Sequence, residues 1–216
     1  MRVEIASDVV CPWCYIGKRR FEAAVRQLAD QSGVLDIEVR YRAFILDPSA
    51  PIDEVQPVRD AYARRFGGAE KAAEILRSVT HVAANEGLEL RMDQALRANT
   101  VRAHRLLKIV EREAPRLQAS INEAIMRAYF LEGLNINDTT VLVALATQQG
   151  FDRYELALEL TDDSPSSESA RAVQSDLEWV SQHDITAVPT FVINDSFAIP
   201  GAQDASTFAR LLGRFQ

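Results

Sequence analysis

Apolar and polar residues alternate at the start of the chain, a pattern that is typical of a β-strand. The alternation runs through Val3-Glu4-Ile5-Ala6 and stops at Ser7-Asp8. Apolar residues then recur at helical spacing from Pro12 to about Gln31, and Pro12 suits a first helical turn because its missing N–H would have no partner there anyway. A second alternating run covers 35–41. The N-terminal part of the chain therefore predicts a strand–helix–strand unit.

The middle of the chain, from about 55 to 183, carries almost no strand pattern and predicts helices. The expected helices are 55–66, 69–86, 98–113, 116–132, 139–149, 154–161 and 167–183. Three of these helices end on a glycine followed by an apolar residue, as helix C-termini often do: Gly87-Leu88, Gly133-Leu134 and Gly150-Phe151. Asp138-Thr139 and Ser164-Pro165 are typical helix starts.

Strand patterns return near the C-terminus. The segments 190–193 and 197–199 predict a hairpin, because Asn194-Asp195-Ser196 between them is a turn sequence. A last helix is expected over 204–212. The fold class that follows is α/β: residues 1–50 and 184–216 form one discontinuous domain around a single sheet, and residues 51–183 form an all-helical insertion.

Composition narrows the classes of function. The chain has 216 residues, of which 47 % are hydrophobic, and a net charge of −7, which argues against a nucleic-acid partner. No run reaches the roughly 18 apolar residues that a membrane span needs. Met1-Arg2 leads directly into the first strand with no signal peptide, so we expect a cytoplasmic protein with no membrane partner. The oligomeric state, monomer or homodimer, stays open.

The two cysteines of the chain lie together in Cys11-Pro12-Trp13-Cys14, between the first strand and the first helix. A helix N-terminus stabilises a thiolate, because orphan N–H groups and the helix dipole favour negative charge there. We therefore expect the pKa of the Cys11 thiol to lie within about 3.5–7.5 and the pair to cycle between dithiol and disulfide. We expect this pair to be the redox centre, with neither a metal site nor another cofactor.

Other interpretations of the cysteine pair stay open. A zinc site needs about four ligands, and the three histidines, His81, His104 and His183, are scattered singly. A structural disulfide would close so small a ring that it would stabilise the chain weakly. Chance proximity is the remaining alternative.

Pro189 stands at the start of the strand that follows Ala187-Val188. A proline without an N–H is tolerated as the first residue of a strand, which is the plain interpretation. The alternative is a cis peptide bond between Val188 and Pro189 that exposes backbone to an extended substrate. The local sequence alone favours the plain interpretation, because only about 5–6 % of such bonds are cis.

Taken together, several blocks of the sequence resemble the DsbA-like branch of the thioredoxin superfamily, of the FrnE type. The blocks are Ser7 to Gly17 around the cysteines, Tyr41-Arg42-Ala43-Phe44 with Asp47-Pro48, Asn99-Thr100 with Ala103-His104-Arg105-Leu106, and Val188 to Ile193 leading to Pro200-Gly201-Ala202-Gln203. They lie in the expected order over nearly the whole chain. The resemblance implies a thioredoxin-like fold interrupted by a helical domain, and catalysis of dithiol–disulfide exchange.

The resemblance also implies roles for individual residues. Cys11 is the nucleophile that forms the mixed disulfide, and Cys14 attacks this intermediate and releases the substrate. Pro189 is cis and lies opposite the cysteines. Val188 offers its backbone to an extended substrate.

Five further residues have weaker assignments. Pro12 and Trp13 shape the environment of the thiolate, although Trp13 also fits a plain packing role. Asn99 and His104 are candidate substrate-binding residues on a helix that roofs the site, with a helix cap and an ordinary helix histidine as the alternatives. Asp8 either raises a thiol pKa or merely ends the first strand.

Three functions are compatible with these observations. The first is a thiol–disulfide oxidoreductase or isomerase that acts on protein or small-molecule thiols. The second is a glutathione-using isomerase or transferase on the same scaffold, although such relatives carry serine at the position of Cys11. The third is a binding module with incidental thiols. The intact cysteine pair favours the first, with glutathione as an open co-substrate.

Overall fold

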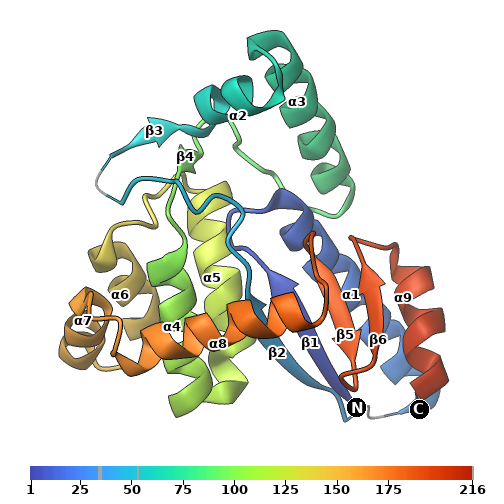
Figure 1. The fold of residues 1–216 in the computed structure, drawn as a ribbon. Helices are drawn as coiled ribbons and strands as arrows, with labels where there is room; N and C mark the ends of the chain where they lie inside the picture. Colours follow the sequence, from blue (N-terminus) through green and yellow to red (C-terminus); the bar gives the residue numbers. More distant parts are fainter. Residues whose placement is uncertain (34–35, 53, 216) are drawn as a thin grey trace.

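The computed structural model describes residues 1–33, 36–52 and 54–215 and contains a four-stranded sheet in the order β2-β1-β5-β6 (Figure 1). Strand β1 (Arg2–Ser7) pairs in parallel with β2 (Glu38–Ala43) and antiparallel with β5 (Thr190–Ile193), and β5 pairs antiparallel with β6 (Phe197–Pro200). The two ends of the chain therefore form one sheet. The predicted start of the second strand at Leu35 lies outside the described residues.

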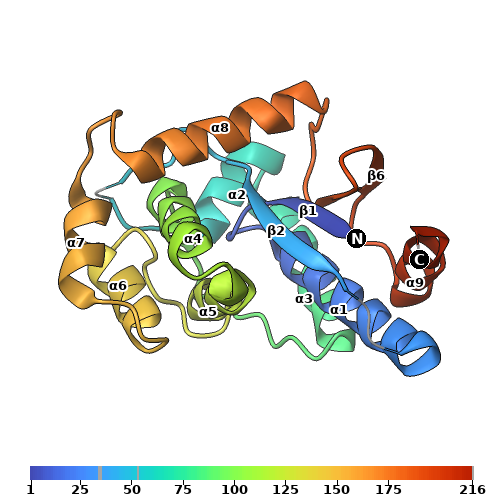
Figure 2. The same ribbon diagram turned by 90° about the horizontal axis from the view of Figure 1, so that it is seen from below.

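Helices cover both faces of this sheet, as Figure 2 shows. On one face, α1 (Pro12–Ser32) and α9 (Ala205–Leu212) pack on Val3, Ile5 and Phe191. On the other face, α8 (Glu168–Gln182) covers Ala6 and Val192. The alternation of β1 separates these two cores, because successive side chains of a strand point to opposite faces.

The hairpin and the helix ends follow the local signals of the sequence. Asn194 and Asp195 adopt positive φ values of 48° and 59°, as a tight turn between antiparallel strands requires. The backbone N–H of Leu88 returns to the carbonyl of Ala83 across Gly87, whose φ is 73°, and so closes the end of a helix. The carboxylate of Asp138 accepts the N–H of Thr140 and so caps the helix that was predicted to begin at Asp138-Thr139.

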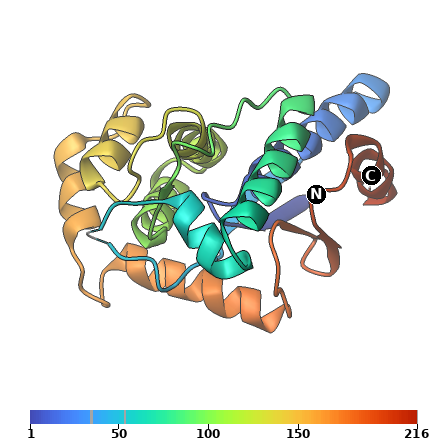
Figure 3. The same cartoon turned by 90° about the horizontal axis from the view of Figure 1, so that it is seen from above.

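The insertion consists mainly of helices. These are α2 (Val58–Phe66), α3 (Ala69–Asn85), α4 (Val101–Glu113), α5 (Gln118–Phe130), α6 (Thr139–Thr147), α7 (Arg153–Thr161) and α8, which leads to β5. Short 3₁₀ turns lie at Pro115–Leu117 and at Gly213–Phe215. Figure 1 shows the α2–α3 hairpin above the other insertion helices, and Figure 3 shows α3 running alongside α1.

The expectation of an all-helical insertion is wrong in one detail. Two short strands of two residues each, β3 (Gln56–Pro57) and β4 (Leu96–Arg97), pair with each other. In the sequence, β3 directly precedes α2 and β4 precedes α4. Pro57 has an extended backbone, with φ −60° and ψ 135°, and disfavours helix at the residue before it, so α2 begins at Val58 rather than near 55. The N–H of Val58 then bonds the carbonyl of Ala95 and extends the link between the two segments.

The expected domain limits fall between elements of the structure. Residues 50 and 51 lie between β2 and β3, and residues 183 and 184 lie between α8 and β5. As limits of independent domains they stay predictions. None of the helices within the described ranges has the length and apolar character that crossing a bilayer requires.

A buried ionic network holds α8 and α4 to the sheet. Asp176 is fully buried and accepts hydrogen bonds from the guanidinium of Arg42 at 2.8 Å and from the N–H of Ala43 at 3.0 Å. Lys108 of α4 pairs with the same carboxylate at 3.1 Å. Arg42 also pairs with Glu4, which is buried in β1, so the polar residue of the β1 alternation faces this network rather than solvent.

Asp176→Ala is therefore expected to lower the free energy of unfolding by about 3–5 kcal/mol, because it leaves two partly buried cations and a buried N–H group without their acceptor. Urea unfolding followed by circular dichroism measures the change. Glu178→Ala, on the exposed side of the same helix, is the matched control and should change stability by less than about 0.5 kcal/mol. Equal effects of the two substitutions would contradict the role of the network.

Candidate active site

Cys11 is the N-cap residue of α1. Pro12 fills the first helical position, the first turn contains no acidic residue, and no side chain caps the helix. The N–H of Cys11 bonds the carbonyl of Asp8 at 3.0 Å, which fixes the turn between β1 and α1. The sulfur of Cys11 therefore lies at the positive end of a 21-residue helix with no carboxylate of that turn competing for the position.

Cys14 lies one turn further into the same helix and is more enclosed. Its exposed fraction is 2 %, against 5 % for Cys11, and both are free thiols. Burial raises the pKa of the Cys14 thiol well above its usual value, and a hydrogen bond and the charge of Cys11 raise it further, against opposing contributions from Ser7 and the Asp8 backbone. Cys14 is therefore held as a neutral thiol behind Cys11.

The Val188–Pro189 peptide bond is cis, and this segment lies directly against the cysteine turn. The thiol of Cys11 is 3.9 Å from the carbonyl oxygen of Val188. The ring of Pro189 packs over Gly17 in α1, where a Cβ atom would lie only 3.0 Å from its Cγ atom. The structure thus brings Cys11, Val188 and Pro189 together, as the sequence resemblance implies.

A cavity of about 540 Å³ opens over Cys11. Its thioredoxin side includes Cys11, Pro12, Trp13 and Val188, and its other side comes from α2, α3 and the end of α5 in the insertion. Trp13 is 42 % exposed, so its ring presents an open apolar surface beside the cysteine instead of filling the core. Cys14 does not line this cavity. A molecule in the cavity can therefore reach Cys11 but not Cys14, a clearer difference between the two cysteines than their exposed fractions show.

The charged residues around the cavity are mostly cationic. Arg64, Arg65 and Arg97 line it, and Asp47 is the single carboxylate among the described lining residues. Arg97 binds Asp47 at 2.8 Å, and this hydrogen bond is the main cause that lowers the pKa of Asp47 below its usual value. The exposed Arg64 and Arg65 thus lie beside the cavity with no carboxylate of its wall to neutralise them.

Asn99 and His104 lie outside the lining of this cavity. Asn99 accepts the N–H of Val101 and donates to the carbonyl of Ala50 at 3.0 Å. It therefore forms a turn just before α4, whose N-cap residue is Thr100, and ties this turn to the loop at Ala50. His104 is 3 % exposed and lies beneath the cysteine turn. The assignment of both residues to substrate binding has no support from these contacts.

Asp8 and His104 form a buried pair. The Nε2 atom of His104 lies 3.3 Å from the Asp8 carboxylate and 3.1 Å from the carbonyl of Phe44; because both neighbours are acceptors, Nε2 carries a proton. Asp8 also accepts the N–H of Leu46 at 2.8 Å. Asp8 therefore does more than end the first strand: it ties the cysteine turn to the segment after β2 and to the insertion.

Several residues that line the cavity are not among the site residues predicted from the sequence. Tyr62 on α2 and Tyr129 at the end of α5 both line it, as do the arginines described above. Helical spacing alone presents such residues as ordinary core or surface positions. Only the packing of α2 and α5 over the first turn of α1 brings them to Cys11.

Comparison with known proteins agrees with this geometry. The family model of the DSBA-like thioredoxin domain matches residues 2–213. The structure superimposes on that of a probable DsbA oxidoreductase from Streptomyces coelicolor with a TM-score of 0.88, at 35 % identity, covering 99 % of this chain and 89 % of that one.

Two further relatives are more distant. Cytosolic disulfide reductase DsbM from Pseudomonas aeruginosa, in a structure with GSH, gives a TM-score of 0.67 at 18 % identity, covering 100 % of this chain and 98 % of that one, and so shares the fold. The protein YwbO of Bacillus subtilis (strain 168) is 27 % identical over 217 residues, covering 98 % of this chain and 96 % of the relative.

The difference between the two thiols predicts selective alkylation. With iodoacetamide on the reduced, folded protein at pH 7, Cys11 should be modified while Cys14 stays unmodified, because the raised pKa of Cys14 leaves almost no thiolate and the cavity reaches only Cys11. Peptide mass spectrometry measures the two sites separately. Modification of both cysteines at equal rates in the folded state, with equal rates after unfolding as the reference, would contradict the assignment.

The close approach of Pro189 to α1 predicts that Gly17→Ala destabilises the protein. The gain in helix propensity, about 1 kcal/mol, is smaller than the cost of overpacking, about 1–3 kcal/mol. We expect a net loss of up to about 2 kcal/mol in urea unfolding. The matched control is Gly213→Ala, where the new Cβ would lie 3.9 Å from Leu28 and no loss is expected. Stabilisation by both substitutions would show that the Pro189 segment adapts freely.

Proposed function

Because the chain belongs to the family of DsbA-like thioredoxin domains, we propose that it is a thiol–disulfide oxidoreductase that cycles Cys11 and Cys14 through a mixed disulfide. The observation that carries this proposal is the unequal placement of the two sulfurs. Cys11 lies at the N-cap of α1 and lines the cavity, whereas Cys14 lies behind it as a neutral buried thiol. A nucleophile and a resolving thiol require this difference.

The exchange proceeds in two steps. The Cys11 thiolate attacks one sulfur of a substrate disulfide; the substrate S–S bond breaks, a bond between Cys11 and that sulfur forms, and the other sulfur leaves as a thiolate. Cys14 then loses its proton and attacks the sulfur of Cys11, which forms the Cys11–Cys14 disulfide and releases the second substrate thiol. Two electrons pass from the protein to the substrate, and the reverse sequence oxidises a substrate dithiol.

The shape and charge of the cavity favour a small anionic thiol as a substrate. A volume of about 540 Å³ falls within the range of small-molecule sites, and a folded protein could insert only an extended segment. Arg64 and Arg65 would attract carboxylates of the substrate. Glutathione, present in the DsbM structure, belongs to this class of thiol, and we propose it as a co-substrate.

An extended protein segment has a second place to bind. The backbone of Val188 adjoins Cys11, and a peptide could pair with it as an added strand. A polypeptide substrate would then lie along Val188, with the disulfide over Cys11 and neighbouring side chains against the exposed ring of Trp13. Small thiols and protein thiols thus compete for one sulfur in one cavity.

The test uses two cysteine variants. Cys11→Ser is expected to lose exchange by more than about a thousandfold, because no other thiol lines the cavity among the described residues. Cys14→Ser should keep the first step and accumulate a mixed disulfide with glutathione, visible as a mass increase that dithiothreitol removes. Exchange by Cys11→Ser at the parent rate would overturn the proposal. Conversion of a glutathione conjugate without any change of thiol redox state would indicate an isomerase or transferase.

A further inference from the structure

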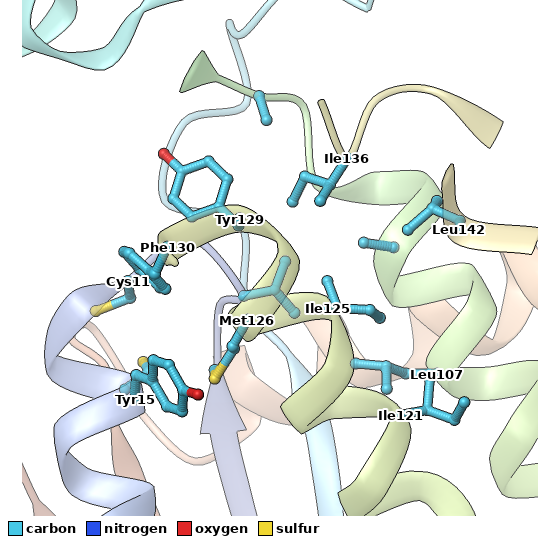
Figure 4. Close-up of a cluster of buried hydrophobic side chains, with 14 of the residues drawn as sticks. Cys11, Tyr15, Leu107, Ile121, Ile125, Met126, Tyr129, Phe130, Ile136 and Leu142 are labelled. Carbon is cyan, nitrogen blue, oxygen red and sulfur yellow. The ribbon is translucent and has the colours of Figure 1, made fainter. Parts of the chain in front are cut away.

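Two tyrosines line the cavity over Cys11, and neither hydroxyl has a hydrogen bond to any described residue. Tyr62 lies on α2, and Tyr129 lies in the last turn of α5. Tyr129 is 1 % exposed, and its ring packs edge-on against Phe130 with the centroids 4.7 Å apart. Figure 4 shows its hydroxyl pointing away from the aliphatic side chains of Ile125 and Met126. The ring belongs to the core, and the hydroxyl belongs to the cavity.

A buried tyrosine hydroxyl usually has a partner, because leaving it unsatisfied costs free energy. The same protein shows the usual arrangement: Tyr15 is equally buried, and its hydroxyl donates to Glu123 at 2.6 Å. Tyr129 has no such partner within the described chain, although it is surrounded by protein. Its position suits a donor that is used by a molecule in the cavity.

Both phenols stay protonated under the conditions of thiol exchange. Burial, and then the negative charge of Cys11, raise the pKa of Tyr62 to about 12. Burial raises the pKa of Tyr129 further, and the charge of Tyr62 adds to the effect. The charge of Cys11 thus contributes to the raised pKa of Tyr62, and the charge of Tyr62 contributes to the raised pKa of Tyr129. The three groups share one space in which the phenols act as donors.

We propose that Tyr62 and Tyr129 donate hydrogen bonds to the sulfur that leaves when Cys11 attacks a substrate disulfide, a role that rests on the proposed function. In this step the attacking, central and leaving sulfurs lie roughly in line. Cys11 approaches from the thioredoxin side, so the leaving sulfur lies toward the insertion, which carries both tyrosines. The electron pair of the broken S–S bond stays on the leaving sulfur; the phenols keep their protons and stabilise its charge through hydrogen bonds.

The arginines of the cavity wall fit a different role. Arg97 is held by Asp47 and by the hydroxyl of Ser49 at 2.9 Å, and Arg64 donates to Gln56 at 3.1 Å. Arg65 lies over the ring of Phe66, 5.7 Å from its centroid. These cations are suited to carboxylates of the substrate, whereas the phenols offer neutral donors from within the apolar wall.

The experiment compares disulfides whose leaving thiols differ in pKa. The probes are the mixed disulfide of glutathione with 5-thio-2-nitrobenzoate, which releases an acidic aromatic thiol, and glutathione disulfide, which releases an alkyl thiol. Tyr62→Phe, Tyr129→Phe and the double variant remove the hydroxyls and keep the rings. Reduction by the reduced protein is followed under single-turnover conditions.

We expect each single substitution to lower the rate with glutathione disulfide by about tenfold, as the loss of a hydrogen bond to a charged atom does. With the aromatic leaving group the loss should stay below about threefold, because that thiolate is already stable and needs less help. The matched control is Tyr154→Phe: Tyr154 is 71 % exposed on α7, outside the cavity, and this variant should match the wild type with both probes.

Each other outcome overturns the inference. Equal losses with both probes would mean that the hydroxyls position the site in general, and unchanged rates would mean that they contact no reacting atom. A change in KM alone would place them on the body of the substrate. Tyr62→Phe, which alters a half-buried residue, supplies the test if Tyr129→Phe fails to fold. Failure of the proposed function is distinct: the wild type itself would then reduce neither probe faster than Cys11→Ser.

Discussion

The site depends on the burial of the first turns of α1 in the core of the insertion. Cys11, Cys14, Tyr15 and Ile16 belong to the hydrophobic cluster that the insertion helices form, whereas the later turns of α1 pack on the sheet. Tyr15 stacks on Phe130 with centroids 5.8 Å apart. One helix thus connects two cores, and the orientation of the cysteine turn follows from the packing of the insertion as much as from the thioredoxin-like sheet.

Charged contacts reinforce the same junction. Glu123 of α5 accepts the hydroxyl of Tyr15 at 2.6 Å and pairs with Lys18 at 2.7 Å, and Lys18 is 5 % exposed. A buried ion pair contributes little net stability, but removing one partner is costly, so such a pair specifies one arrangement of the two elements. Here that arrangement sets the position of α5, and with it Tyr129, relative to Cys11. The polar junction therefore serves the geometry of the site more than its stability.

Local signals in the sequence were sufficient for the strands of the main sheet, for most helices and for the cysteine turn. Helical spacing, the glycine at 87 and the turn at Asn194-Asp195 each depend on a few neighbouring residues, and the structure shows the expected conformation at each. The β3–β4 pair and the cavity depend instead on distant segments. No periodicity reveals that Tyr62 and Tyr129 meet over Cys11. Nor does it reveal that His104, one turn into its helix, faces Asp8.

The charge distribution places positive charge at the cavity of a chain that is acidic overall. The net charge is −7, yet three arginines and one neutralised aspartate line the cavity. Because Arg64 and Arg65 are exposed, salt screens them beyond about 8–10 Å, and they act only on molecules that have reached the mouth. The proposed carboxylate-bearing substrate depends on this positive charge at the cavity. Since the net charge of the whole chain is negative, this cluster of cations makes the mouth of the cavity locally favourable to anions.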